Sequence, residues 1–254
     1  MPLLFVFYIM KSIVNYLVIA ILSVNVAHAM QNETECSPAF FTQANSFFSQ
    51  YVSNGKVDYK AIKANPTLLN ELVKTASTKV VDKSDKATYQ AFWINAYNIT
   101  VIKSIVANYP IKSPLDKAGF FDKTKHTIAN QSFTLNDIEN TILRAQFKDP
   151  RFHFVLVCGA TSCPPIISEA YMPATLDQQM TKQTSLALNG TYFITVDSKK
   201  KRVVASKIMS WYNDDFKMNG STEIDFINTY RKEKIPTDYK IIYSEYNWSL
   251  NIKS

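Results

Sequence analysis

Three side chains that can do thiol or imidazole chemistry lie close together in this sequence: His153, Cys158 and Cys163. The chain has only three cysteines and three histidines, so no other segment concentrates these groups in the same way. A thiolate activated by an imidazole can be a nucleophile, two cysteines can form a disulfide, and thiolates with an imidazole can bind zinc. The residues therefore indicate a site but leave three kinds of chemistry open.

The segment that carries these residues is predicted to be a buried strand followed by a loop. Residues 152–157 form a short run rich in aromatic and β-branched side chains, which is typical of a core strand. A glycine and a Pro-Pro pair then carry the chain into a surface loop. In a strand, His153 and Cys158 lie on opposite faces and about 16 Å apart, so they are not a local pair. Cys163 differs, because the loop can fold back and bring its sulfur beside His153.

The N-terminus is typical of a secretory signal peptide over residues 1–29, with a single lysine, an apolar stretch and an Ala-His-Ala ending. A retained membrane anchor is the alternative, because the apolar stretch is nearly long enough to span a bilayer. We expect cleavage, no stable membrane insertion afterwards, and a periplasmic or extracellular location, where disulfides persist. Residues 30–37 are expected to be disordered, and residues 38–254 to form one domain.

Helices dominate the first half of this domain. Apolar residues recur at helical spacing from Pro38 to Tyr51, and a second helix begins near Pro66. The longest predicted helix follows Asp85 and stops at Pro110. Because its residues are apolar nearly all round, we expect it to be the central buried helix.

Two more helices flank the cysteine segment. Thr134 followed by Asp137 predicts the capped start of a helix that runs to Phe147. Pro173 opens the other helix, whose apolar side chains, Leu186 among them, are expected to face inward.

The strands cluster late in the chain. A hairpin is predicted over residues 192–196 and 202–205, followed by Ser206 as a helix N-cap. A helix over 222–231 and a strand over 239–243 complete the pattern. We therefore expect an α+β fold, with several helices packed on a small, mostly antiparallel sheet in a single domain.

Polar residues in apolar places are the remaining candidates. Asn95 and Asn98 share one face of the predicted central helix, and a buried amide without partners costs roughly 1–3 kcal/mol. Either they hydrogen-bond loop backbone and hold the tertiary fold, or Asn95 orients the imidazole of His153 as in a Cys-His-Asn arrangement. Glu139 could instead accept a hydrogen bond from that imidazole. Asp214-Asp215 resembles a solvated helix end and is assigned no chemistry.

The sharpest functional hypothesis is a thiol-dependent acyl transferase or amide hydrolase acting in the cell envelope. Its nucleophile would be Cys163, activated by His153, with Asn95 or Glu139 holding the imidazole. One alternative is a non-enzymatic binding or interaction module, stapled by a disulfide between Cys158 and Cys163 and using exposed aromatic residues. Another is a metal site of the histidine and both cysteines, although their spacing fits no common zinc pattern.

Composition narrows the partners. The net charge of +7 comes from lysines and arginines scattered along the chain, and the single run, 199–202, is typical of a solvated turn. Basic and aromatic residues do not alternate, which argues against a nucleic-acid partner, while weak attraction to anionic cell-surface polymer stays open. We expect no cofactor, and a partner that is an envelope or extracellular ligand.

Several motifs, in this order, resemble the domain of unknown function 547 family, which occurs in bacterial exported proteins and in some plant and worm proteins. The matching segments are 91–98, 135–139 with 143–144, 153–154, 158 with 162–165, 206–208 with 211–212 and 215–216, and 248–251. The resemblance implies that His153, Cys158 and Cys163 belong together and that Cys36 and His126 stand apart. The family often has a histidine at position 140, where this chain has asparagine, so no role for that histidine carries over. The family name implies no function.

Overall fold

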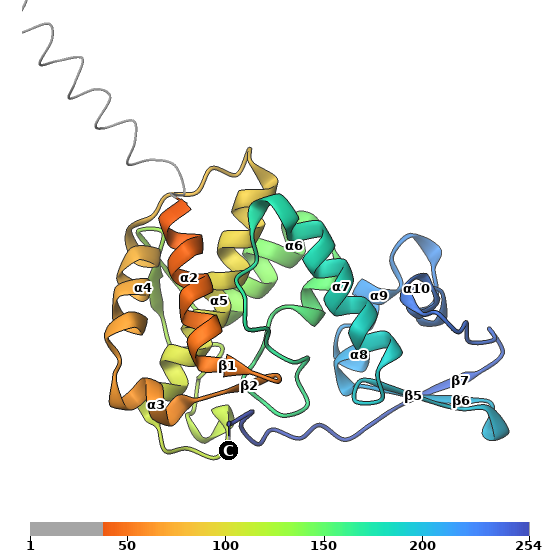
Figure 1. Cartoon of the computed structure of the whole chain (residues 1–254). Coiled ribbons are helices and arrows are strands. Elements are labelled where there is room, and N and C mark those ends of the chain that lie inside the picture. Colours follow the sequence, from red (N-terminus) through yellow and green to blue (C-terminus); the bar gives the residue numbers. More distant parts are fainter. Residues whose placement is uncertain (1–37, 254) are drawn as a thin grey trace, which may run out of the picture.

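The computed structural model describes residues 38–253 of the chain. The predicted signal peptide, the segment 30–37 and Cys36 lie outside these residues. Helices predominate, and the β5–β6–β7 sheet lies at one end of the molecule, so the predicted α+β class is confirmed (Figure 1). Within the described part of the chain, no helix is both long and apolar enough to cross a membrane.

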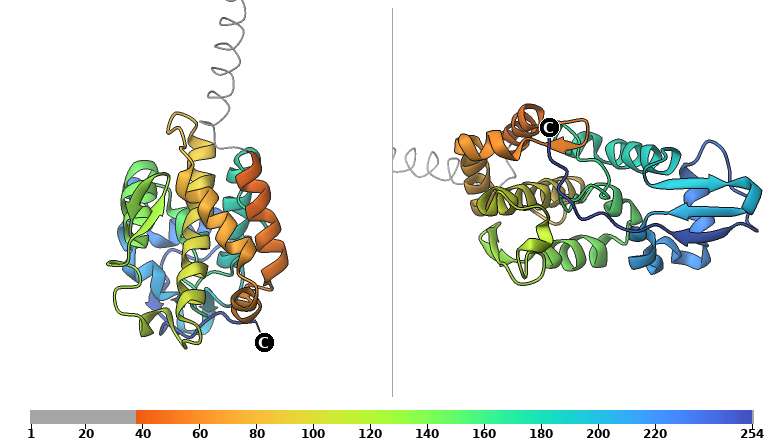
Figure 2. Two further views of the ribbon diagram at one scale, coloured as in Figure 1. Left: turned by 90° about the vertical axis from the view of Figure 1, so that its left-hand side faces the viewer. Right: turned by 90° about the horizontal axis from the view of Figure 1, so that it is seen from below.

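The first helices pack around one buried helix. They are α2 (Pro38–Tyr51), α3 (Tyr59–Ala64) and α4 (Thr67–Thr78), and they lie on one side of α5 (Lys86–Asn108), as Figure 2 shows. Asp85 caps α5 by accepting a hydrogen bond from the backbone of Thr88, as the predicted start requires. Buried residues occur on every side of α5, which confirms it as the central helix.

Two short hairpins accompany this helical part. The strands β1 (Val52–Ser53) and β2 (Lys56–Val57) pair through an Asn54-Gly55 turn, in which both residues have positive φ. The strands β3 (His126–Ile128) and β4 (Gln131–Phe133) form the second hairpin.

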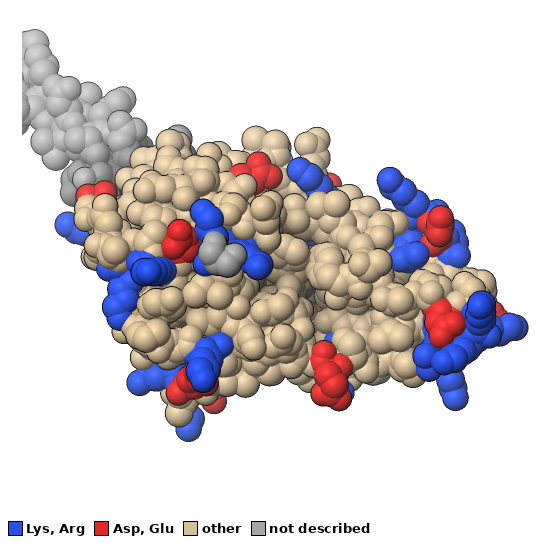
Figure 3. Space-filling model, turned by 60° about the horizontal axis from the view of Figure 1, so that its bottom comes forward, with Lys and Arg blue, Asp and Glu red and all other residues tan. Residues whose placement is uncertain are grey.

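The third sheet has the predicted antiparallel hairpin at its centre. The strand β5 (Ile194–Asp197) pairs with β6 (Arg202–Ala205) in antiparallel fashion, and β7 (Lys240–Tyr243) joins β6 in parallel. The basic run 199–202 lies at the hairpin turn, where Lys199, Lys200 and Lys201 are exposed. Figure 3 shows lysine and arginine gathered at this end of the molecule, so the prediction of a solvated turn is confirmed.

Helices cover the rest of this part. They are α7 (Leu176–Asn189), α8 (Lys207–Trp211), α9 (Asn213–Phe216) and α10 (Glu223–Tyr230). Ser206 caps α8 through a hydrogen bond from the backbone of Ile208, as predicted. The inward position predicted for Leu186 is wrong, because its side chain is 55% exposed on α7. Four short 3₁₀ turns lie between these elements: η1 (Pro114–Asp116), η4 (Pro173–Thr175), η5 (Ser198–Lys200) and η6 (Met218–Gly220).

A π-helix precedes the cysteine segment. It is η2 (Asp137–Arg144), continued by α6 (Ala145–Phe147), so the predicted helix exists but is wound more loosely than an α-helix. Thr134 and Asp137 exchange backbone and side-chain hydrogen bonds of 2.8 and 3.0 Å, which confirms the predicted capped start. Residues four and five apart lie toward one side of a π-helix, and Arg144 accordingly bonds Asn140 and lies within electrostatic range of Glu139.

The strand predicted over residues 152–157 is wrong. The chain forms the 3₁₀-helix η3 (Pro150–Phe154) instead, because Pro150 suits a first helical position and the Asp149 carboxylate accepts a hydrogen bond from the backbone of Arg151. The buried backbone that follows needs no neighbouring strand. The amide of Asn98 donates to the carbonyl of Val155 at 2.9 Å and accepts from the N–H of Val157 at 2.8 Å.

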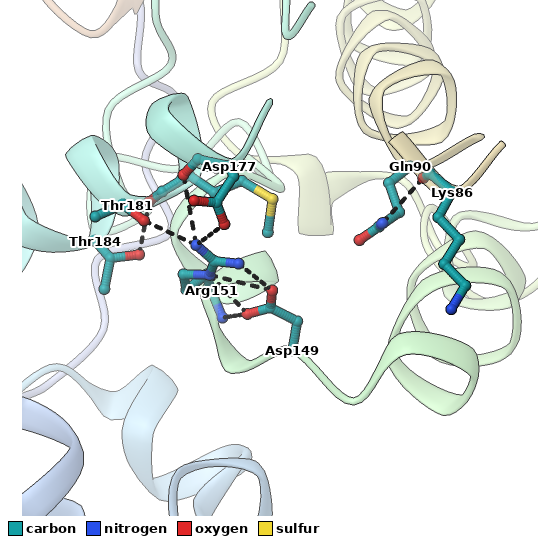
Figure 4. Close-up of polar contacts among 8 residues, drawn as sticks. Lys86, Gln90, Asp149, Arg151, Asp177, Thr181 and Thr184 are labelled. Atoms are coloured by element: carbon teal, nitrogen blue, oxygen red, sulfur yellow. Dashed lines mark hydrogen bonds and ion pairs between the residues drawn. The ribbon is translucent and has the colours of Figure 1, made fainter. Parts of the chain in front are cut away.

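The helix η3 joins two hydrophobic cores. Phe152 is buried in the larger core around α5, whereas Phe154 is buried in the core under the β5–β6–β7 sheet. Arg151 anchors the outer side of η3 by bonding Asp149 and, on α7, Asp177 and Thr181 (Figure 4). The residue between the two phenylalanines is His153, which is therefore held where the cores meet.

We expect Asn98→Ala to lower the free energy of unfolding by roughly 2–4 kcal/mol, because it leaves two buried backbone groups without partners. Urea denaturation followed by circular dichroism measures the loss. Asn108→Ala is the matched control on the same helix, since its amide bonds only the carbonyl of Ser104 in its own helix. A loss in the Asn98 variant no larger than in the control would contradict the structural role given to Asn98.

Candidate functional site

A cavity of about 250 Å³ lies at the junction of the two cores. Six of its thirteen lining residues are aromatic, and these rings come from both parts of the fold. They are Tyr97, Phe121, Trp211, Tyr212, Tyr246 and Trp248. Trp211 is 47% exposed, so it forms part of the opening of the cavity to solvent.

The polar and aliphatic side chains of the wall include three of the four catalytic residues predicted from the sequence. His153, Cys163 and Glu139 line the cavity together. The other lining residues are Asn136, Leu156, Cys158 and Ile208. The tertiary structure thus gathers these three side chains, from η3, the cysteine loop and η2, around one space.

Asn95 lies elsewhere. Its amide donates to the backbone carbonyl of Tyr171 at 2.8 Å and to that of Ala91 at 2.9 Å, and it accepts from the N–H of Tyr171 at 3.0 Å. These bonds occupy the amide and hold the loop before η4 against α5. The pairing with His153 that would have made Asn95 part of a Cys-His-Asn arrangement is not formed, and the amide has the structural role that was the alternative.

His153 is held by Asp215, an aspartate predicted to belong to a solvated helix end. Its Nε2 lies 2.7 Å from Oδ2 of Asp215, which also accepts a hydrogen bond from Nε of Arg144 at 2.7 Å. The imidazole packs on the ring of Tyr212, with centroids 4.1 Å apart. The prediction that Asp215 belongs to a solvated helix end is therefore wrong, and neither Asn95 nor Glu139 orients the imidazole.

A signal for this partner was present in the sequence. Tyr212 and Asp215 are three residues apart, which places them on one face when the segment is helical. An aromatic ring and a carboxylate on one face suit an imidazole, which can stack on the first and bond the second. The competing interpretation of an acidic, solvated end took no account of the residue on the same face.

The charges around Asp215 favour its ionised form. Burial acts to raise its pKa, but hydrogen bonds from His153 and Arg144, together with their positive charge, hold the pKa below the ordinary value of 3.8. The guanidinium of Arg144 also lies over the ring of Tyr212, 4.6 Å from the centroid. The carboxylate thus fixes the guanidinium of Arg144 and holds the imidazole of His153 in one orientation.

The two cysteines of the cavity wall form a disulfide. Cys158 and Cys163 have Cα atoms 6.3 Å apart, and the hydroxyl of Tyr246 lies 3.2 Å from each sulfur. The disulfide predicted as one alternative is present, so Cys163 has no thiolate in this form of the protein. The alternative of a metal site is not formed, because both sulfurs are in the disulfide and residues 38–253 contain no cluster of three metal-binding side chains.

Glu139 is a buried carboxyl group beside aromatic hydroxyls. Glu139 is 8% exposed, and the hydroxyl of Tyr97 donates a hydrogen bond to its carboxyl group at 3.4 Å. Burial, followed by the negative charge of Glu139, raises the pKa of Tyr97, Tyr212 and Tyr246. All three hydroxyls therefore stay protonated at neutral pH and can act as hydrogen-bond donors in the cavity.

Residues 81–186 match the family described as Protein of unknown function, DUF547. The match spans α5, η2, η3 and the cysteine loop, and it confirms the resemblance drawn from the sequence motifs. The motifs beyond residue 186 lie outside the matched segment. Neither the curated proteins nor the solved structures gave a match to the chain.

We expect Asp215→Asn to reduce the free energy of unfolding by roughly 1–3 kcal/mol at about pH 7, because it weakens two charge-assisted hydrogen bonds. The folded pKa of Asp215 is lowered, so its contribution is present above about pH 4 and is lost as the pH falls further. The difference from wild type should therefore shrink on acidification. Urea denaturation across this pH range measures it.

Asp214→Asn is the control for that measurement, because Asp214 is exposed and its side chain makes no hydrogen bond or ion pair with residues 38–253. An equal, pH-independent loss in both variants would show that the carboxylate of Asp215 does not stabilise the site.

Proposed function

We propose that this member of the DUF547 family, matched over residues 81–186, is a binding protein whose aromatic cavity holds a small ligand. The observation that carries the proposal is the wall itself. Six aromatic side chains face a space of about 250 Å³, together with a few polar groups that can orient a ligand. Ligand sites are typically of this kind, mostly apolar with a small number of placed polar groups.

The size of the cavity limits the ligand. Pockets for drug-sized molecules begin at about 300 Å³, so this cavity suits a smaller molecule or one end of a larger one. The disulfide supports a binding role because it ties two residues of the wall together and restrains the loop between them. A preformed wall binds more tightly, since less freedom is lost when the ligand enters.

The proposal includes the location inferred from the N-terminal sequence. A disulfide in the cavity wall is consistent with export to the periplasm or the cell exterior, because such bonds persist in oxidising compartments. The ligand would then be an envelope or extracellular molecule.

A second function is favoured by one arrangement of side chains. His153, held by Asp215, and Cys163 line the same cavity, which is the basis of a thiol-dependent acyl transferase or amide hydrolase. Two molecules of a small thiol would first reduce the disulfide to two protein thiols and would themselves be oxidised to a disulfide. Nδ1 of His153 would take the proton of Cys163, the thiolate would form a thioester with the acyl group, and the imidazolium would protonate the leaving group. Water would then release the acid.

We expect uncharged and cationic fragments that contain an apolar group to bind in the cavity, and Trp211→Ala to weaken them about tenfold or more. Ligand-observed NMR with a fragment panel identifies the binders, and isothermal titration calorimetry measures their affinities. Tyr192→Ala is the matched control, because Tyr192 is an aromatic residue of similar exposure, 50%, that does not line the cavity. Fragments that bind both variants equally well do not occupy the cavity, and a panel made up only of these would refute a binding function there.

The proposed thiol chemistry is tested in a chain that carries Cys36→Ser, so that Cys158 and Cys163 are its only cysteines. Cys158→Ser leaves Cys163 as a free thiol, so hydrolysis of p-nitrophenyl acetate should proceed without reductant. Wild type should hydrolyse it only after reduction, and Cys163→Ser should be at least about tenfold slower than Cys158→Ser. The release of p-nitrophenol is followed by absorbance. Equal rates in the two serine variants would leave Cys163 without a catalytic role.

A further inference from the structure

We propose that the ligand of the aromatic cavity is an organic cation of the substituted-ammonium class. The inference rests on the proposed binding function and names the chemical class that the cavity selects. Aromatic cages are a recurrent means of recognising such cations, because the negative faces of the rings attract the charge. The charge balance of the wall, the partners of Glu139 and the arrangement of the rings support it.

The wall carries negative charge without a matching positive one. Glu139 is the only acidic residue that lines the cavity, and no lysine or arginine among residues 38–253 lines it. The lone imidazole, His153, is engaged by Asp215 behind the wall. A cation entering the cavity therefore meets a carboxylate and no fixed positive side chain.

Glu139 has no ion-pair partner in the described part of the chain. It is 8% exposed, and a buried charge that is not paired is expensive. The nearby guanidinium of Arg144 is within electrostatic range of Glu139, but its ion pair is with Asp215. Among the described residues, only tyrosine hydroxyls bond the Glu139 carboxyl group directly, that of Tyr97 at 3.4 Å and that of Tyr212. A ligand cation would supply the missing countercharge.

The rings are placed to contact that cation. Trp211 and Trp248 are stacked with centroids 5.9 Å apart, and Tyr246 packs against both at 4.8 and 4.7 Å. These three rings form one wall of the cavity, and Tyr97 and Tyr212 belong to the same lining as Glu139. Methyl groups of a substituted ammonium can pack on such rings while the charge lies near the carboxylate.

Choline and its tert-butyl analogue, in which carbon replaces the nitrogen, separate charge from shape. We expect choline to bind wild type about tenfold more tightly than the neutral analogue, measured by calorimetry at constant ionic strength. Glu139→Gln should narrow the difference in affinity between choline and the analogue, because only the attraction of the rings remains, and should leave the affinity for the analogue unchanged. Glu223→Gln is the matched control, because Glu223 is also buried and also bonds a tyrosine hydroxyl, that of Tyr243, outside the cavity.

The outcomes are distinct. Equal affinity for the two molecules would overturn the cation proposal and leave the binding function standing, as would an equal loss of choline binding in both glutamine variants. If neither molecule binds wild type, the cation proposal is also overturned, and the fragment panel then decides the binding function by itself. Loss of choline affinity in Glu139→Gln alone would support it.

Discussion

The side-chain amide of Asn98 makes the hydrogen bonds that a neighbouring strand would otherwise make to the backbone after His153. It bonds both the carbonyl of Val155 and the N–H of Val157, so this buried backbone crosses the central helix without a sheet. Because no ladder is required, the residues just before it are free to wind into η3. Phe152, His153 and Phe154 then point into the larger core, the cavity and the smaller core. The path of the backbone that follows the imidazole therefore depends on Asn98.

The cavity exists because two cores meet without merging. Tyr97 and Glu139 belong to the part built around α5 and η2, whereas Trp211 and Tyr246 belong to the part that carries the small sheet. The hydroxyl of Tyr246, 3.2 Å from both sulfurs of the disulfide, links the two parts across the wall. The shape of the cavity therefore depends on how the two parts dock, and on the oxidation state of two cysteines at the seam.

Of the two acidic side chains near the cavity, Asp215 has ion-pair partners and Glu139 has none among the described residues. Asp215 takes hydrogen bonds from both Arg144 and His153, and of these three residues only His153 lines the cavity. Glu139 is left with the hydroxyls of Tyr97 and Tyr212 as its hydrogen-bond partners. Asp215 thus has positive groups as partners, whereas the carboxyl group of Glu139 has no ion pair. Such a site is well suited to a cationic ligand. The hydrogen bond to Asp215 fixes the orientation of the His153 imidazole, although Cys163 is in the disulfide and is not a thiolate.

The sequence alone determined the elements whose signals are local. The capped, apolar helix α5, the Thr134–Asp137 start of η2 and the β5–β6 hairpin each follow from residues within a few positions of one another, and so does the family resemblance. Contacts between residues far apart in the sequence could not be predicted from it. Residues 152–157 have the composition of a strand, but a side chain from α5 supplied the hydrogen bonds. His153 found its carboxylate 62 positions away, in a segment that resembled a solvated helix end. Composition records what a residue prefers, whereas only the packed chain decides which partner satisfies a buried polar group.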